Sequence, residues 1–233
     1  MRLAVISDIH SNLEALTAVL AEADARGAAK IYCLGDVVGY GADPEGCVDL
    51  VRLHCAGTVL GNHDQATVDE SFEYHLPRPG MMAVRHNRER LSEEQLDFLA
   101  ALPLLIEEDG CTFVHATPEE PAAWHRIGPF ELTRRQFKHF QTDVCFVGHT
   151  HVPGLVSDRI GTVQMRRGNR YLINVGSVGR PRDGDARACL VLFDTEAFTW
   201  DLVRVRYDAE AAAEKILQAG LPEALADGLL IGR

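Results

Sequence analysis

The sequence predicts an α/β protein (α+β in some classifications) in which two β-sheets lie face to face and helices cover the outside. Short apolar runs alternate with amphipathic helical patterns in the first part of the chain, which is typical of a parallel sheet covered by helices. Pairs of apolar runs around turn residues follow later, which indicates antiparallel strand pairs. The chain has 233 residues, 46% hydrophobic and 24% charged, an ordinary globular composition. We expect one domain spanning residues 1–233.

The first elements follow a β–α–β–α–β order. The apolar run Leu3–Ile6 predicts a buried strand. Ser11 or Asn12 then caps a helix whose leucines and valine recur at spacings of three and four, and Gly27 ends it. Further strands are expected at 31–34 and 58–60, with a helix from Pro44 between them.

The second part of the chain mixes helices with paired strands. Ser92 and Gln95 form a capping box that opens a helix, and Pro103 ends it. Gly168-Asn169 between Val163–Met165 and Tyr171–Ile173 predicts a hairpin. Val68–Pro79 is the loosest stretch, and we expect a flap over the site there. The other expected elements are helices at 81–91, 132–140 and 209–226, and strands at 104–107, 111–114, 144–147, 188–193 and 200–206.

Charge and cysteine content limit the classes of function. Lys and Arg number 23 against 34 Asp and Glu, which gives a net charge of −11. This acidic balance argues against a long nucleic acid as partner, because such a polymer needs a basic surface. No apolar run is long enough for a membrane span or a signal peptide, so we expect a cytoplasmic protein. The six cysteines form no CxxC pair, and buried free thiols are expected.

Polar groups that can bind a metal follow five of the predicted strands. Each group alone has an ordinary interpretation as a helix cap, a turn or a structural histidine. Their joint occurrence at strand ends favours a metal site, because binding sites lie at the carboxyl ends of parallel strands. The motifs are Ser7-Asp8-Ile9-His10, Gly35-Asp36-Val37-Val38-Gly39-Tyr40-Gly41, Gly61-Asn62-His63-Asp64, His115, and Gly148-His149-Thr150-His151.

The composition of this set indicates the kind of metal. Without His63, it holds two Asp, one Asn and four His. Mixed nitrogen and oxygen ligands suit Mn, Fe, Co, Ni or Zn ions better than Ca²⁺. Seven ligands exceed what one tetrahedral ion needs and fit two ions that share a carboxylate.

The motifs DxH, GDxxGYG, GNHD and GHTH, in this order and with a strand-end histidine, resemble the calcineurin-like metallophosphoesterase family. Within this family, the chain is similar to the small bacterial and archaeal phosphodiesterase-type members. Residues 173–182 also resemble the glycine-rich loop of these proteins, which usually reads NPGSVG, with Val175 replacing the proline. The resemblance runs from residue 3 to about 194.

The resemblance implies a four-layer αββα sandwich of two mixed sheets and assigns a role to each site residue. A first metal would be bound by Asp8, His10 and His151, a second by Asn62, His115 and His149, and Asp36 would bridge them. His63 would be the metal-free histidine beside the substrate phosphate, with Asp64 orienting its ring.

The resemblance also implies hydrolysis of a small phosphate ester by attack of a hydroxide that bridges the metals. Tyr40 stands where the serine/threonine phosphatases of the family carry an arginine, reading GDxxDRG, which favours a diester over a monoester. Arg180 or Arg182 can supply the missing charge, although solvated surface is the favoured interpretation of both. Trp124 can stack on a nucleobase, but packing is favoured.

Several alternatives remain open at the level of sequence. The same site would serve a dinucleotide polyphosphate hydrolase or a phosphomonoesterase. A nuclease acting on long polymers is disfavoured by the charge, and a protein-binding scaffold is disfavoured because all the expected ligands are present. Among the other histidines, only His75 and His125 are expected to reach the site from loops.

Overall fold

The structure is a computed structural model that describes residues 1–128, 130–159 and 164–233. The strands are β1 (Arg2–Ile6), β2 (Lys30–Cys33), β3 (Gly57–Thr58), β4 (Leu105–Glu108), β5 (Cys111–Val114), β6 (Val144–Val147), β7 (Gly154–Ser157), β8 (Tyr171–Asn174), β9 (Ala188–Asp194) and β10 (Thr199–Val205). The helices are α1 (Leu13–Ala25), α2 (Pro44–His54), α3 (Asn62–Val68), α4 (Arg78–Arg90), α5 (Glu93–Ala100), α6 (Phe130–Arg135), α7 (Ala209–Gln218) and α8 (Glu223–Ile231), with short 3₁₀ helices η1 (Glu70–His75), η2 (Pro121–Ala123) and η3 (Gln136–Lys138).

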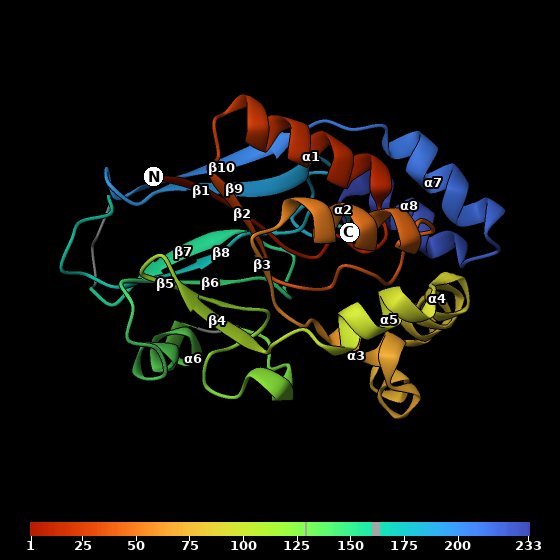
Figure 1. Cartoon of the computed structure of the whole chain (residues 1–233), viewed down its shortest axis with the longest axis horizontal. Helices are drawn as coiled ribbons and strands as arrows, with labels where there is room; N and C mark the ends of the chain where they lie inside the picture. Colours follow the sequence, from red (N-terminus) through yellow and green to blue (C-terminus); the bar gives the residue numbers. More distant parts are fainter. Residues whose placement is uncertain (129, 160–163) are drawn as a thin grey trace.

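The strands form two mixed sheets of five strands each, in the orders β10-β9-β1-β2-β3 and β4-β5-β6-β8-β7. In the first sheet β1 runs parallel to β2 and antiparallel to β9, and in the second β6 runs parallel to both β5 and β8. Figure 1 shows α1 and α2 over the first sheet, α7 and α8 beyond them on the right, and α6 beneath the second sheet. The predicted two-sheet α/β sandwich is therefore confirmed.

Alternation along β1 explains why this strand lies in the middle of the layers. Leu3 and Val5 point into the core between the sheets, whereas Ala4 and Ile6 pack against the helices outside. A strand with a period of two presents successive side chains to opposite faces, so a strand buried on both faces is apolar throughout. All four of these side chains are fully buried.

The second sheet is buried on both faces in the same way. Phe113 of β5 and Phe146 of β6 stack with ring centroids 5.5 Å apart in the core between the sheets. On the outer face Cys145 packs with Phe137 and Phe140. Phe137 and Phe140 therefore cover the outer face of the sheet. They come from the region where a helix was expected at 132–140, and the structure has α6 followed by η3 there.

Helix ends follow the sequence signals closely. The Asn12 side chain accepts a hydrogen bond from the Ala15 amide at the start of α1, and Gly27 has a φ of +70° just past its end. Ser92 and Gln95 form the predicted capping box of α5. Local side-chain chemistry therefore sets these boundaries.

Two predictions of secondary structure are wrong. The antiparallel partner of β8 is β7 (Gly154–Ser157) instead of Val163–Met165, and of that segment Val163 lies outside the described residues. The helix expected over 209–226 is broken into α7 and α8, because Gly220 takes a φ of +69° and Pro222 follows two residues later.

No helix in the described ranges is long and apolar enough to cross a membrane. The cytoplasmic location stays a prediction.

The stretch expected to cover the site contains η1, which is fixed to α4 by ion pairs. The buried Glu73 carboxylate accepts a hydrogen bond of 2.9 Å from Nε of Arg85 and lies 3.4 Å from Nη1 of Arg88. Arg88 also donates to the backbone carbonyls of Ala66 and Thr67 in α3. These contacts hold η1, α3 and α4 together beside the site.

We expect Glu73→Gln to lower the melting temperature by a few degrees at pH 7 and to lose this effect in acid. The arginine hydrogen bonds hold the pKa of Glu73 below its usual value. Its contribution to stability is therefore present above the pKa of the unfolded chain and is lost as the pH falls through the lower folded pKa. Thermal unfolding between pH 3 and 8 measures this, with the exposed Glu70→Gln as the matched control. An effect of Glu73→Gln that is the same at all pH values would contradict it.

Candidate metal centre

Five strand ends meet at one edge of the sandwich and carry all seven predicted ligands. Six of them are buried, with exposed fractions between 0 and 8%, and Asn62 is half-buried. Three groups of these side chains, with His63 as an additional member, place their ligand atoms within 4.8 Å of one another, so that each could hold an ion. The groups are Asp8, His10 and His151; His10, Asp36 and His63; and Asp36, His115 and His149.

The backbone at the strand ends turns each side chain toward this centre. Past β1 and β2, the amide of Asp8 donates to the carbonyl of Gly35 and the amide of His10 donates to that of Asp36. Five of the seven candidate ligands have positive φ angles, between 51° and 63°. Such angles cost free energy for residues with a Cβ atom, and strained backbone of this kind clusters at functional sites. The five are Asp8, His10, Asp36, His149 and His151.

Two glycines of the motifs are required by close approach. A Cβ atom on Gly61 would lie 2.2 Å from the amide nitrogen of Asp36. Gly39 has a φ of +100°, and a Cβ atom there would lie 2.5 Å from Nδ1 of His63. These glycines therefore allow the second and third motifs to pack directly on each other.

Hydrogen bonds to backbone carbonyls fix the protonation of two histidines. Nδ1 of His10 lies 3.2 Å from the carbonyl oxygen of Val38, and Nδ1 of His151 bonds to that of Arg180. A carbonyl only accepts, so each Nδ1 carries the proton and each Nε2 carries a lone pair. The two Nε2 atoms nevertheless face each other at 3.1 Å. Burial lowers the pKa of His10 to about 3, so this pair is neutral at pH 7.

Two facing lone pairs beside carboxylates are the arrangement that a cation stabilises. Oδ1 of Asp8 lies 3.2 Å from Nε2 of His151. Burial and the neighbouring Asp8 raise the pKa of Asp36 well above its usual value, because the two carboxylates repel each other in a buried place. A divalent ion would remove at once the repulsion between the two Nε2 lone pairs and the repulsion between the two carboxylates. The residues present thus fit a metal site.

A second set of donors lies on the other side of Asp36. Nδ1 of His115 donates to the carbonyl of Leu34 at 2.8 Å, which leaves its Nε2 as a lone pair. That Nε2 lies 3.2 Å from both Oδ1 of Asn62 and Nδ1 of His149. Oδ2 of Asp36 is 3.5 Å from Nε2 of His115 and 3.7 Å from Nε2 of His10 in the first set. One carboxylate oxygen therefore lies between the two sets.

His63 lines the cavity, but Asp64 does not contact its ring. The Asp64 carboxylate accepts hydrogen bonds from the amides of Val38 and Gly61, both at 3.1 Å. Nδ1 of His63 is buried and has no hydrogen-bond partner among the described residues. The ring-orienting role expected of Asp64 is thereby corrected. As the third residue of α3 it caps the helix and fixes the loop that carries Val38 instead.

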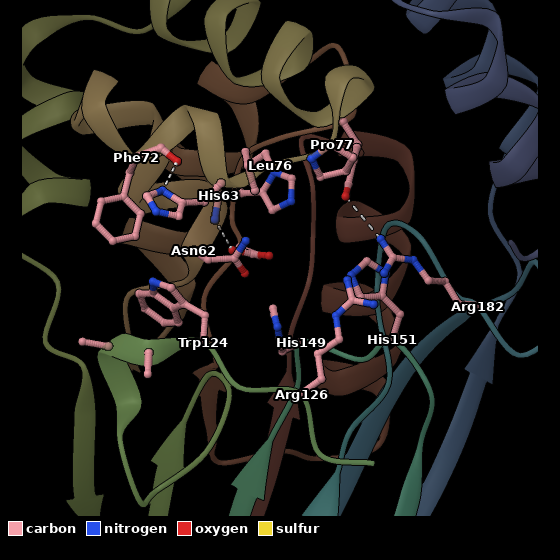
Figure 2. A pocket seen from close by; sticks show the side chains of 15 residues that line it. Asn62, His63, Phe72, Leu76, Pro77, Trp124, Arg126, His149, His151 and Arg182 are labelled. Atoms are coloured by element: carbon pink, nitrogen blue, oxygen red, sulfur yellow. Dashed lines mark hydrogen bonds between the residues drawn. The ribbon is translucent and has the colours of Figure 1, made fainter.

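A cavity of about 460 Å³ opens above these residues (Figure 2). Its lining includes Arg182, Trp124 and His75, so the surface interpretation of Arg182 is wrong and the reach expected of His75 is confirmed. Nη2 of Arg182 lies 3.3 Å from the hydroxyl of Tyr40. His125 pairs with Glu120 instead.

Arg180 is half-buried and does not line the cavity. Its guanidinium lies 4.9 Å from the Tyr40 ring centroid and donates to the carbonyl of Leu225 in α8. Burial lowers the pKa of Arg180 to about 10. Phe72, Leu76 and Pro77 line the cavity from the stretch 68–79 that was expected to cover the site, although no motif singled out these side chains. Arg126 lines it from a segment that carried no signal in the sequence.

Comparison with known proteins agrees with this fold. The chain is similar over 100% of its length to a metallophosphoesterase from Sphaerobacter thermophilus, with a TM-score of 0.87, 36% identity and 99% of that chain covered. It has the same fold as the hypothetical protein PH1004 from Pyrococcus horikoshii, with a TM-score of 0.83, 21% identity and coverage of 100% and 98%.

A family model establishes the family, and a curated relative matches almost the whole chain. The uncharacterized protein MJ0912 from Methanocaldococcus jannaschii is 42% identical over 242 aligned positions, which cover 99% of this chain and 98% of the relative. The model of the calcineurin-like phosphoesterase superfamily domain matches residues 1–197. The chain therefore belongs to the calcineurin-like phosphoesterase superfamily.

Proposed function

We propose that this protein is a phosphodiesterase that uses two metal ions to hydrolyse a small phosphate ester. The observation that carries the proposal is the position of Asp36, whose Oδ2 lies within 4 Å of Nε2 of both His10 and His115. Each of these nitrogens faces a further histidine nitrogen at 3.1 to 3.2 Å. Such an arrangement supports two ions that share one carboxylate.

The chain offers a complete ligand set for each ion. Asp8, His10 and His151 would hold the first, Asn62, His115 and His149 the second, and Asp36 both. This mixture of imidazole and oxygen ligands suits Mn, Fe, Co, Ni or Zn. When bound, such ions neutralise a phosphoryl group and lower the pKa of water toward neutrality.

Residues of the chain then bind and orient the ester. We propose that His63, which lines the cavity, either donates to a phosphoryl oxygen or protonates the leaving oxygen. Arg182 would hold a second phosphoryl oxygen, since a guanidinium binds phosphate through paired donors. Asp64 supports His63 indirectly, because its carboxylate accepts a hydrogen bond from the Gly61 amide and fixes the backbone that carries His63.

The whole chain, residues 1–233, would act as one domain. Helices α7 and α8 lie beyond the part matched by the family model, yet Ile216 and Leu225 pack in one apolar cluster with Tyr40 and Ala83. Tyr40 lines the cavity, so the last helices support the wall of the site.

The position of Arg182 favours a monoesterase as the second candidate. Its guanidinium reaches the hydroxyl of Tyr40, the residue that replaces the arginine of the protein phosphatases. Arg182 can therefore supply the positive charge that Tyr40 lacks, and without such a charge the binding of a monoester dianion is disfavoured. A dinucleotide polyphosphate, cleaved at a phosphoanhydride bond on the same site, is the other alternative substrate.

A substrate panel tests the proposal directly. The purified protein, loaded in turn with Mn, Fe, Co, Ni or Zn ions, is assayed on bis-p-nitrophenyl phosphate, p-nitrophenyl phosphate, diadenosine tetraphosphate and 2′,3′-cyclic AMP. We expect metal-dependent turnover that is higher for the diester than for the monoester. No turnover on any ester with any of the five metals would overturn it, and preference for the monoester would establish the second candidate.

We expect Asp36→Asn to lose at least one metal ion and most of the activity. An amide lacks the negative charge that lets a carboxylate serve two cations. Elemental analysis of the metal-loaded variant measures the stoichiometry. The matched control is Asp109→Asn, which changes a carboxylate bound to Lys30 and Tyr32 away from the cavity. Two ions retained per chain in Asp36→Asn would refute the bridging role.

His63→Ala should reduce kcat roughly 10²-fold or more with both metals still bound, within the range for general acid catalysis. The reason is that the ligand sets above are complete without His63. Steady-state kinetics and metal analysis are compared with His86→Ala, a histidine of α4 outside the cavity lining. Unchanged turnover would remove His63 from the mechanism.

Arg182→Ala should raise KM about tenfold or more, because hydrogen bonds to charged groups contribute roughly 1.5–3 kcal/mol. Arg182→Lys should restore only part of the loss, since an ammonium lacks the paired donors of a guanidinium. The exposed Arg206→Ala is the control. If Arg182→Ala had the same kinetic constants as the wild type, Arg182 would not bind the phosphate.

A further inference from the structure

The cavity has two chemically different sides. Figure 2 shows Phe72 and Trp124 on one side of Asn62 and His149, with Arg126 and Arg182 on the other. The aromatic side is extended by two alanines of η2, Ala122 and Ala123. A small anion would use only the basic side and the ligand cluster. The apolar side therefore indicates that the substrate carries a further, flat and apolar group.

Trp124 is held rigidly in place for such a group. It has a φ of +53°, and its Nε1 donates to Oε1 of Gln65 in α3 at 2.9 Å. Its ring meets the ring of His115 edge-on, with centroids 5.8 Å apart. The polar atom of the indole is thus satisfied by the protein, while the residue still lines the cavity. A preorganised aromatic face of this kind binds planar rings at a small entropic cost.

The opposite part of the aromatic side comes from η1. The rings of Phe72 and His75 lie 4.9 Å apart with an angle of 34° between their planes. Nδ1 of His75 lies 3.2 Å from the carbonyl oxygen of Phe72, so this nitrogen carries the proton. In the neutral ring Nε2 carries the lone pair, and His75 lines the cavity, so the side chain offers an acceptor for an amino group on the edge of a planar ring.

We propose that the cavity binds a nucleoside phosphate ester, with the base against Trp124 and Phe72 and the phosphate over the ligand cluster. This inference rests on the proposed function for the place of the phosphate. The base supplies a flat ring that stacks on aromatic side chains, and an amino-bearing base such as adenine also matches the acceptor on His75. The cavity volume of about 460 Å³ lies within the range of sites for small ligands.

Binding of matched ligands to the manganese-loaded protein tests the inference without relying on turnover. Isothermal titration calorimetry compares AMP with ribose 5-phosphate, which differ only in the base, and with inorganic phosphate, and the ligands are checked for integrity afterwards. We expect AMP to bind about tenfold or more tightly than ribose 5-phosphate, as expected for one stacked base. Equal affinities of these two ligands, or no binding of either, would overturn the inference.

Variants identify the side chains responsible. The ratio of the dissociation constants of ribose 5-phosphate and AMP should fall toward one in Trp124→Ala and in Phe72→Ala, and Trp124→Phe should keep most of it. Phe98→Ala is the matched control and should leave the ratio unchanged. It removes an aromatic ring of α5 that packs under Arg52 of α2. A ratio unaffected by both cavity variants would also overturn the inference.

The two proposals fail in different ways. If the metal-loaded protein hydrolyses no ester, the proposed function fails, whereas the preference for AMP over ribose 5-phosphate is still measured. If the esters are hydrolysed but AMP and ribose 5-phosphate bind equally, the aromatic subsite fails and the phosphoesterase stands.

Discussion

The structure depends on one electrostatic constraint, which is that buried carboxylates and neutral imidazoles meet with their lone pairs facing inward. Asp8 and Asp36 are almost fully buried, and Nε2 of His10 faces Nε2 of His151 at 3.1 Å. Burying such groups costs free energy unless a cation or a proton lies among them. Because the backbone carbonyl of Val38 fixes the proton of His10 on Nδ1, the cluster cannot satisfy itself by changing tautomer. Occupancy by cations is the arrangement that the surrounding structure favours.

The rest of the fold holds this unfavourable cluster in position. Strands fully buried between two layers of helices end in residues with positive φ, and glycines such as Gly61 let neighbouring loops touch. The cost of each strained residue is met by the packing of the sheets behind it. Asp64 illustrates the principle, since a buried carboxylate next to the site uses both oxygens on the amides of Val38 and Gly61. Such rigidity is what a site with several ligands requires.

Sequence patterns predict the ligand cluster well because its residues follow short apolar strands in recognisable motifs. They predict the side chains of the cavity walls less well, because Phe72 lies in a stretch that was expected near the site only as a loose flap and Arg126 lies in a segment without periodicity or motif, and tertiary packing brings both to the cavity. Asp64 shows a related limit, since adjacency to His63 suggests a contact that the start of α3 prevents. The hairpin expected before β8 failed for a similar reason. The turn signal at Gly168-Asn169 is local, whereas the choice of β7 as partner is made by the whole sheet.

The charge distribution has a consequence for how a substrate is selected. The chain carries a net charge of −11, and an anionic ester is therefore repelled by most of the molecule. Arg126 and Arg182 provide positive charge in the cavity, and divalent ions in the ligand cluster would reverse the local field there. A small ester can enter this region completely, whereas a long polyanion must also cross the acidic surface. The same charge that disfavours nucleic-acid polymers thus leaves their monomeric building blocks as suitable ligands, and the aromatic side of the cavity is the feature that distinguishes them from simple phosphates.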